Sequence, residues 1–165
     1  MKITVEDCLR LDAFRNSTVE SCMRKRDRRV RSVSVFDENN LEAGVERNGV
    51  PEQMVLTHFW QIKDDVEAQC RVISGFGRKQ IATLVVFLNE HGVRALDSRV
   101  IKAAEESGLL VITIADEGEL TYAMVIEQVM DKILYGHNYS DNLLNNTIYH
   151  LLNFEKHSNF QSALK

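Results

Sequence analysis

The sequence predicts an α/β fold in which a mainly parallel sheet is flanked by helices and followed by a C-terminal helical extension. Three short and nearly continuous apolar runs, at residues 54–57, 81–88 and 109–114, have the length of strands. Two helical stretches, residues 62–78 and 98–107, separate these runs. Because parallel strands need long crossovers, this alternation predicts a parallel sheet. Strands that are apolar on both faces indicate that helices cover both sides of the sheet.

Length and composition indicate one globular domain with an appendage. The chain has 165 residues, of which 44% are hydrophobic and 27% are charged, as in ordinary soluble domains. We expect an α/β sensory domain over residues 1–118 and a helical extension over residues 119–165. No apolar run approaches the roughly 20 residues that a membrane helix needs. The N-terminus lacks the apolar core of a signal peptide, so we expect a cytoplasmic protein.

The N-terminal region contains a helix start and two strand signals. Thr4 and Asp7 have the spacing of a capping box and predict a short helix. Residues 18–19 have the character of a short strand. Residues 30–36 alternate between apolar and polar side chains, which predicts a half-buried strand that ends at Asp37.

The segment at residues 38–53 shows little periodicity and contains asparagine, glycine and proline. We therefore expect a long irregular connection. Mobile loops often close over binding sites, so this connection is a candidate lid.

A dense basic run precedes the first long strand. Six of the eight residues at positions 24–31 are basic, which permits a phosphate or nucleic-acid patch. The alternative is a solvated turn that Asp27 partly neutralises, and we favour it because the run has no interleaved aromatic residues. The net charge of -4 also argues against specific DNA binding by this chain alone.

Two apolar stripes follow residue 118. The first lies on a predicted helix and consists of Tyr122, Ile126, Val129, Met130 and Ile133. The second consists of Leu144, Ile148, Leu151 and Leu152. The second stripe has no evident place on a small three-layer core, and an exposed apolar stripe is normally buried by a partner. It therefore predicts a homodimer.

The sequence predicts no catalytic residue, metal site or cofactor. Cys8, Cys22 and Cys70 are odd in number and far apart, which fits neither a disulfide framework nor a zinc site. The five histidines form no ligand pair at helical spacing on one element. No nucleophile motif or dinucleotide fingerprint is present.

Polar residues follow the predicted strands, where open α/β sheets usually bind ligands; they include Thr57, His58, Asn89 and Asp116. The candidate binding residues are Asp37, Thr57, His58, Trp60 and Asn89. Asp37 or His58 would orient a polar ligand and Thr57 would hydrogen-bond to it. We expect the His58 side chain to be partly exposed, so that its removal would cost little stability. Trp60 would stack on a planar group. The alternative is that Phe59 and Trp60 are simply core residues.

Several stretches resemble one family when taken in order. They are TVEDCL at residues 4–9, DRRVRSVSV at residues 27–35, MVLT at residues 54–57, IKDDVEAQC at residues 62–70 and YAMVIEQVM at residues 122–130. This pattern resembles the N-terminal domain of the PucR-like (purine catabolism regulator) transcription factors of bacteria. The sequence departs from the family where glycines are usual, at Cys22, Lys25 and residues 52–53.

The resemblance implies an α/β sensory domain, similar in fold to the N-terminal domain of HPr kinase, that binds a small-molecule effector without catalysis. In the family this domain precedes a middle domain and a helix-turn-helix, so DNA would be contacted only through a domain missing from this chain. The alternatives are a small α/β enzyme acting on a phosphorylated or purine-like substrate, and a pure dimerisation module.

Overall fold

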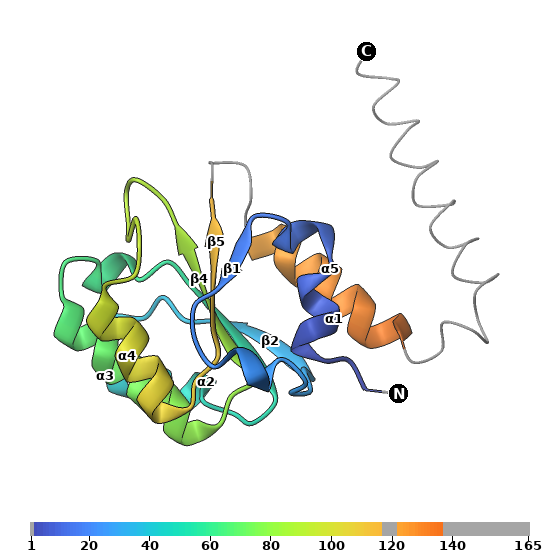
Figure 1. Ribbon diagram of the computed structural model, residues 1–165, viewed down its shortest axis with the longest axis horizontal. Coiled ribbons are helices and arrows are strands. Elements are labelled where there is room, and N and C mark those ends of the chain that lie inside the picture. Colours follow the sequence, from blue (N-terminus) through green and yellow to red (C-terminus); the bar gives the residue numbers. More distant parts are fainter. Residues whose placement is uncertain (1, 117–121, 137–165) are drawn as a thin grey trace, which may run out of the picture.

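The structure is a computed structural model that describes residues 2–116 and 122–136 and contains a five-stranded mixed sheet (Figure 1). The strand order is β1-β5-β4-β3-β2. The parallel strands are β2 (Ser32–Val35), β3 (Gln53–Thr57), β4 (Thr83–Leu88) and β5 (Val111–Ala115). The edge strand β1 (Ser17–Val19) pairs antiparallel with β5. The predicted α/β class and mainly parallel sheet are confirmed.

Helices cover both faces of the sheet (Figure 1). One face carries α2 (Leu41–Asn48), α3 (Val66–Lys79) and α4 (Ser98–Ser107). The other carries α1 (Val5–Leu9), a 3-10 turn at Asp12–Phe14 and α5 (Tyr122–Tyr135). Two further 3-10 turns lie at Met23–Lys25 and Trp60–Ile62. None of the helices in the described ranges combines the length and apolar character that a membrane crossing requires.

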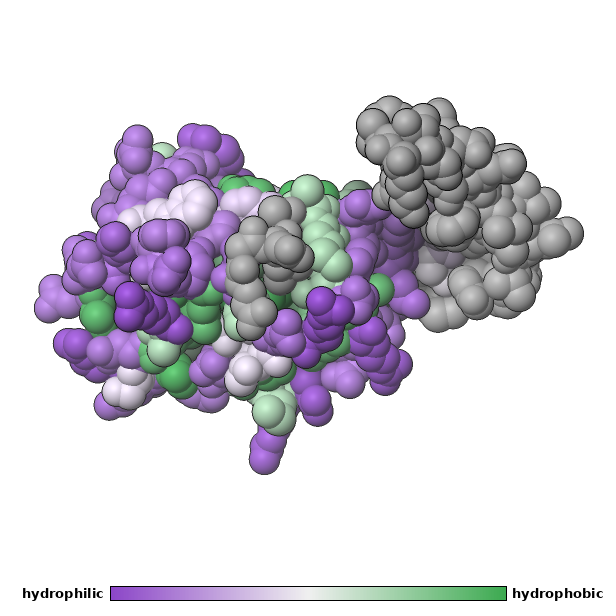
Figure 2. Space-filling view, turned by 90° about the horizontal axis from the view of Figure 1, so that it is seen from above, coloured by the Kyte–Doolittle hydropathy of each residue, from purple (hydrophilic) through white to green (hydrophobic). Residues whose placement is uncertain are grey.

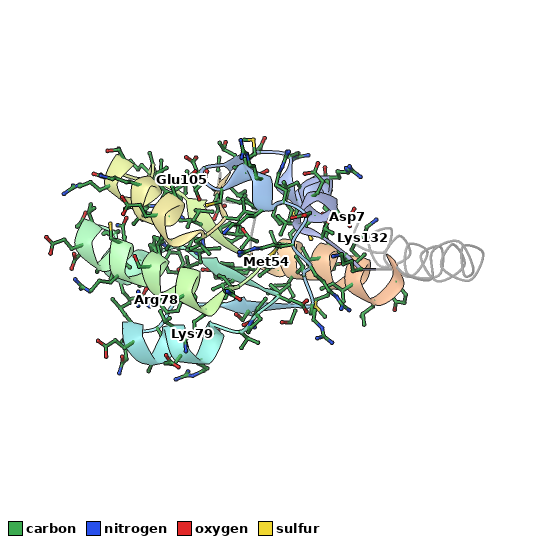
Figure 3. The ribbon with its side chains drawn as sticks, turned by 60° about the horizontal axis from the view of Figure 1, so that its bottom comes forward. Asp7, Met54, Arg78, Lys79, Glu105 and Lys132 are labelled. Atoms are coloured by element: carbon green, nitrogen blue, oxygen red, sulfur yellow. The ribbon has the colours of Figure 1, made fainter. Side chains whose placement is uncertain are left out.

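The core consists of two layers separated by the sheet. The layer under α3 and α4 includes Phe36, Val55, Phe76, Leu84, Val86 and Val111. The layer under α1 and α5 includes Phe14, Met54, Leu56, Val85, Phe87 and Ile112. Each of these side chains is at most 2% exposed, and Figure 3 shows Met54 within the sheet. The apolar runs are continuous because alternate residues of one strand face different layers.

Local caps set the helix boundaries. Thr4 and Asp7 form the predicted capping box at the start of α1. The Asp97 side chain accepts a hydrogen bond from the Arg99 N–H at the start of α4. Gly108 ends α4 with φ of 72°, a left-handed conformation that favours glycine. The predicted bounds of α4 are therefore confirmed.

Two expectations about chain segments are wrong. Residues 62–78 do not form one helix, because the Asp65 side chain caps the Ala68 N–H and α3 begins only at Val66. The expected irregular lid at residues 38–53 contains α2 instead. This helix packs on α3, where Val45 approaches Gly75 and the Lys79 ammonium lies 2.8 Å from Glu46. Figure 3 shows Lys79 on α3, beside α2. Helix α2 therefore belongs to the helical layer and does not form a lid.

The basic run at residues 24–31 is held largely by intramolecular contacts. The Lys25 ammonium donates to the Gly108 carbonyl at 2.8 Å, and the Arg28 guanidinium donates to the Ile81 carbonyl at 2.9 Å. Arg26 pairs with Glu6, and Arg31 pairs with Glu52. These contacts favour the interpretation of a solvated turn. The predicted dimerisation residues lie outside the described residues; they are Leu144, Ile148, Leu151 and Leu152.

Candidate functional site

Four polar side chains meet at the carboxyl edge of the sheet. The in-register parallel strands place Asp37 after β2, His58 after β3 and Asp116 after β5. Tyr122 is the first residue of α5, and its side chain reaches the same edge from the helical layer that contains α1 and α5. We call Asp37, His58, Asp116 and Tyr122 the strand-end cluster. Figure 2 views the molecule from the side toward which β5 points, where hydrophobic residues lie within a largely hydrophilic surface.

Hydrogen bonds connect the strand-end cluster into one chain. The Tyr122 hydroxyl donates to Asp37 Oδ2. His58 Nδ1 lies 2.6 Å from the Tyr122 hydroxyl oxygen, and His58 Nε2 lies 3.4 Å from Asp116 Oδ2. The second oxygen of Asp37 accepts from the Thr57 hydroxyl at 3.2 Å and from the His58 N–H at 3.3 Å. The ends of three strands and α5 are therefore joined through Asp37, His58 and Asp116.

Aromatic rings surround the His58 imidazole. The Trp60 ring stacks on it with a centroid distance of 4.1 Å and an interplanar angle of 11°. Phe87 and Tyr122 contact it at centroid distances of 5.2 and 4.6 Å. His58 is only 6% exposed, whereas Trp60 is 47% exposed. The imidazole is thus covered by a ring that itself faces solvent.

The backbone at Phe59 creates this arrangement. Phe59 adopts φ of 59°, a left-handed conformation that is uncommon for a large side chain. The Thr57 hydroxyl supports the turn by accepting a hydrogen bond from the Phe59 N–H at 3.0 Å. Phe59 is buried at 1% exposure, whereas Trp60 is 47% exposed. The alternative that both rings are simply core is therefore confirmed for Phe59 and wrong for Trp60.

Asn89 lies at the same edge but contacts its own loop. Its side-chain oxygen accepts a hydrogen bond from the His91 N–H at 2.9 Å. A shallow depression of about 450 Å³ is lined by Leu88, Asn89, Glu90, Arg94, Ala115 and Asp116. A Cβ atom on Gly92 would lie 2.9 Å from Trp60, so this loop also presses against the indole. The depression and the strand-end cluster share Asp116.

The structure corrects one expectation about His58. We expected a partly exposed side chain whose removal would cost little stability, but Thr57 is 1% exposed and His58 is 6% exposed. Both are engaged in hydrogen bonds within the protein. Truncating His58 would leave buried polar groups short of partners, which is costly. Among the described residues at this edge, Trp60 is exposed, Asn89 is half-buried and the Asp116 side chain is 11% exposed.

Tyr122 is the site residue that sequence reasoning missed. Helical periodicity placed Tyr122 in an apolar stripe, and the Tyr122 ring does pack on Phe87. Burial and the hydrogen bond to Asp37 raise the pKa of the Tyr122 phenol well above its usual range. The hydroxyl therefore remains a proton donor. The only signal in the sequence is that a buried tyrosine usually needs a hydrogen-bond partner.

Other chemistry-bearing groups lie apart from this edge. Burial raises the pKa of the Cys8 thiol to about 12, which disfavours the reactive thiolate. In the part of the chain that the structure describes, no three His, Cys, Asp or Glu residues are grouped so that they could hold a metal ion. A second hollow lies between α2 and α3, away from the strand-end cluster, with a volume of about 550 Å³.

Fold and site together define an α/β domain with a polar, aromatic-covered cluster at the carboxyl edge of a parallel sheet. The model of the purine catabolism regulatory protein-like family matches residues 7–133. The chain therefore belongs to this family, and it is a regulatory domain of a transcription regulator. Comparison with curated proteins and with solved structures gave no match.

Proposed function

We propose that this domain senses a small polar molecule and that the binding site is the carboxyl edge of the sheet around Trp60. The observation that carries the proposal is the hydrogen-bond chain from Asp37 and His58 to Tyr122. It couples the place where open α/β sheets usually bind ligands to the first residue of α5. A ligand at this edge would therefore act on α5 directly.

The accessible groups suggest the chemistry of the ligand. The exposed indole of Trp60 suits a planar group by stacking. Asn89 and Asp116 supply hydrogen-bonding groups beside it, and Arg94 adds a positive charge in the same depression. These groups favour a small, planar and polar molecule. The family description makes purines and their breakdown products the first compounds to test.

We propose that the domain is not catalytic. A nucleophilic role for Tyr122 would require the phenolate, and both burial and Asp37 disfavour that form. His58 is an unsuitable general base, because both ring nitrogens already face protein groups. An enzyme that acts on a purine-like substrate would need an accessible acid or base, and the strand-end cluster provides little of either.

Signal transfer would run through α5. This helix packs on the sheet with Val125 and Val129 buried, and Tyr122 fixes its first turn. A ligand that competes for Asp116 would disturb His58, which contacts Tyr122, and would thereby shift the position of α5. Such a shift requires that the ligand binds one position of α5 better than another. The proposal therefore predicts that ligand binding alters α5 as well as the pocket.

A thermal-shift screen tests the proposed function. The chain is heated with purines, their breakdown products and amino acids, each in excess. A ligand at about 100 times its Kd adds about 2.7 kcal/mol of stability, which is roughly 5–10 °C for a protein of this size.

Trp60→Ala should abolish the shift. Val50→Ala is the matched control, because Val50 is equally exposed at 47% and lies before β3, at the opposite end of that strand. Retention of the full shift in Trp60→Ala, or no shift with any compound class, would count against the proposal.

A further inference from the structure

We propose that the strand-end cluster holds one proton more than its four side chains carry in their usual neutral-pH forms, so that docking of α5 depends on this proton. The inference concerns Asp37, His58, Asp116 and Tyr122, and it does not rest on the identity or existence of a ligand. It follows from counting hydrogen-bond donors and acceptors along the chain of contacts.

The cluster contains three links, and each link needs a proton between two heavy atoms. The links join Asp37 to Tyr122, Tyr122 to His58, and His58 to Asp116. In their usual forms the two carboxylates carry no proton, the phenol carries one and the neutral imidazole carries one. Two protons leave one of these three links without a proton, and the proposed third proton fills it.

The direction of the links shows where the third proton is needed. Tyr122 has a single hydroxyl proton and donates it to Asp37, so its oxygen must accept from His58 Nδ1. A neutral imidazole protonated at Nδ1 would then direct the lone pair of Nε2 toward the Asp116 carboxylate oxygen at 3.4 Å. A proton on Nε2 or on Asp116 converts this contact between two acceptors into a hydrogen bond. Both placements give the same proton count.

The surroundings favour retention of that proton. The side chains of His58 and Asp116 are only 7% and 11% exposed, so their mutual contact is largely shielded from water. Within the described residues, carboxylates from two elements contact His58: Asp37 after β2 accepts from its backbone N–H, and Asp116 after β5 lies 3.4 Å from Nε2.

The other faces of the imidazole meet Tyr122 from α5, Trp60 from its 3-10 turn and Phe87 from β4. Glu90 and Arg94 lie beyond Asp116 in the depression. A proton on His58 Nε2 or on Asp116 offsets part of the negative charge that the two carboxylates bring to the cluster.

Loss of this proton would weaken the attachment of α5. The helix begins at Tyr122, and the strand-end cluster fixes that residue to the ends of β2, β3 and β5. If the folded state binds one more proton than the unfolded state, stability falls as pH rises through the range in which the proton leaves. Each proton changes the unfolding equilibrium constant tenfold per pH unit. The first turn of α5 should therefore loosen with rising pH.

The proton count can be observed directly by NMR on the whole chain labelled with ¹⁵N-histidine and ¹³C-aspartate. At neutral pH we expect either two protonated ring nitrogens on His58 or a protonated carboxyl carbon signal for Asp116 or Asp37. A His58 ring with one protonated nitrogen, together with ionised carboxylates at Asp37 and Asp116, would overturn the proposal. This readout requires neither a substitution nor a ligand.

Urea unfolding as a function of pH provides the second readout. In Asp116→Asn the amide can donate to Nε2, so the third proton is no longer needed. The unfolding equilibrium constant of the wild type should therefore increase with pH more steeply than that of Asp116→Asn. The difference should reach up to a factor of ten per pH unit. Asp12→Asn is the matched control, because Asp12 is 63% exposed and pairs only with Arg15 among the ion pairs described. It should retain the wild-type slope. Equal slopes in the wild type and Asp116→Asn would refute the inference.

Discussion

Replacing Tyr122 by phenylalanine tests the link between α5 and the strand ends. The substitution keeps the ring, which packs on Phe87 and His58 at centroid distances of 5.1 and 4.6 Å. It removes the hydrogen bond to Asp37 and the contact with His58 Nδ1. Hydrogen bonds to charged groups contribute about 1.5–3 kcal/mol. Asp37 keeps two donors, from Thr57 and His58, so we expect a loss of about 2 kcal/mol.

Urea unfolding should report this loss in the free energy of unfolding, and hydrogen exchange should locate it in the first turns of α5. Thr83→Val is the matched control, because it deletes a neutral hydroxyl bond of 2.8 Å to the Leu110 carbonyl inside the sheet. For this control we expect a loss of about 1 kcal/mol in the free energy of unfolding, with no selective change in the hydrogen exchange of α5. Exchange in α5 that is equal in wild type and Tyr122→Phe would refute the coupling, whatever the change in stability.

Three further predictions concern the core, the thiols and alkaline pH. Val85→Ala should lower the free energy of unfolding, measured in urea, by on the order of 1–3 kcal/mol, because Val85 is fully buried. Cys8, with a pKa raised to about 12, should be alkylated after Cys22 and Cys70 when labelling is followed by mass spectrometry. The raised pKa of Tyr122 stabilises the fold below the unfolded-state pKa of about 10. That stability is lost as pH rises further, so the wild type should lose stability faster above about pH 10 than Tyr122→Phe.

The sheet could be predicted because its strands are apolar on both faces. Residues 54–57, 81–88 and 109–114 contain β3, β4 and β5 or most of them. The boundaries of α4 were predictable because Asp97 and Gly108 are strong local signals. By contrast, α2 has only two turns, and its contact with the core depends on Leu41 and Val45. Two apolar residues do not establish a periodicity.

The site was only partly predictable for a similar reason. Sequence order shows which polar residues follow strands, so Asp37, His58 and Asp116 could be expected at one edge. It does not show that a left-handed Phe59 turns the Trp60 ring onto the imidazole and buries it. The partners of Tyr122 are also remote in the sequence, 85 residues away for Asp37 and 64 for His58. Helical periodicity identifies the buried face of a helix but not what a hydroxyl contacts there.

The most direct test of ligand sensing is the fluorescence of Trp60 during titration with a compound that binds by calorimetry. The chain has one tryptophan, so its emission reports on the carboxyl edge of the sheet alone. We predict a saturable change in emission whose Kd equals the calorimetric Kd. Calorimetric binding that saturates with no change in Trp60 emission would place the ligand elsewhere and contradict the account.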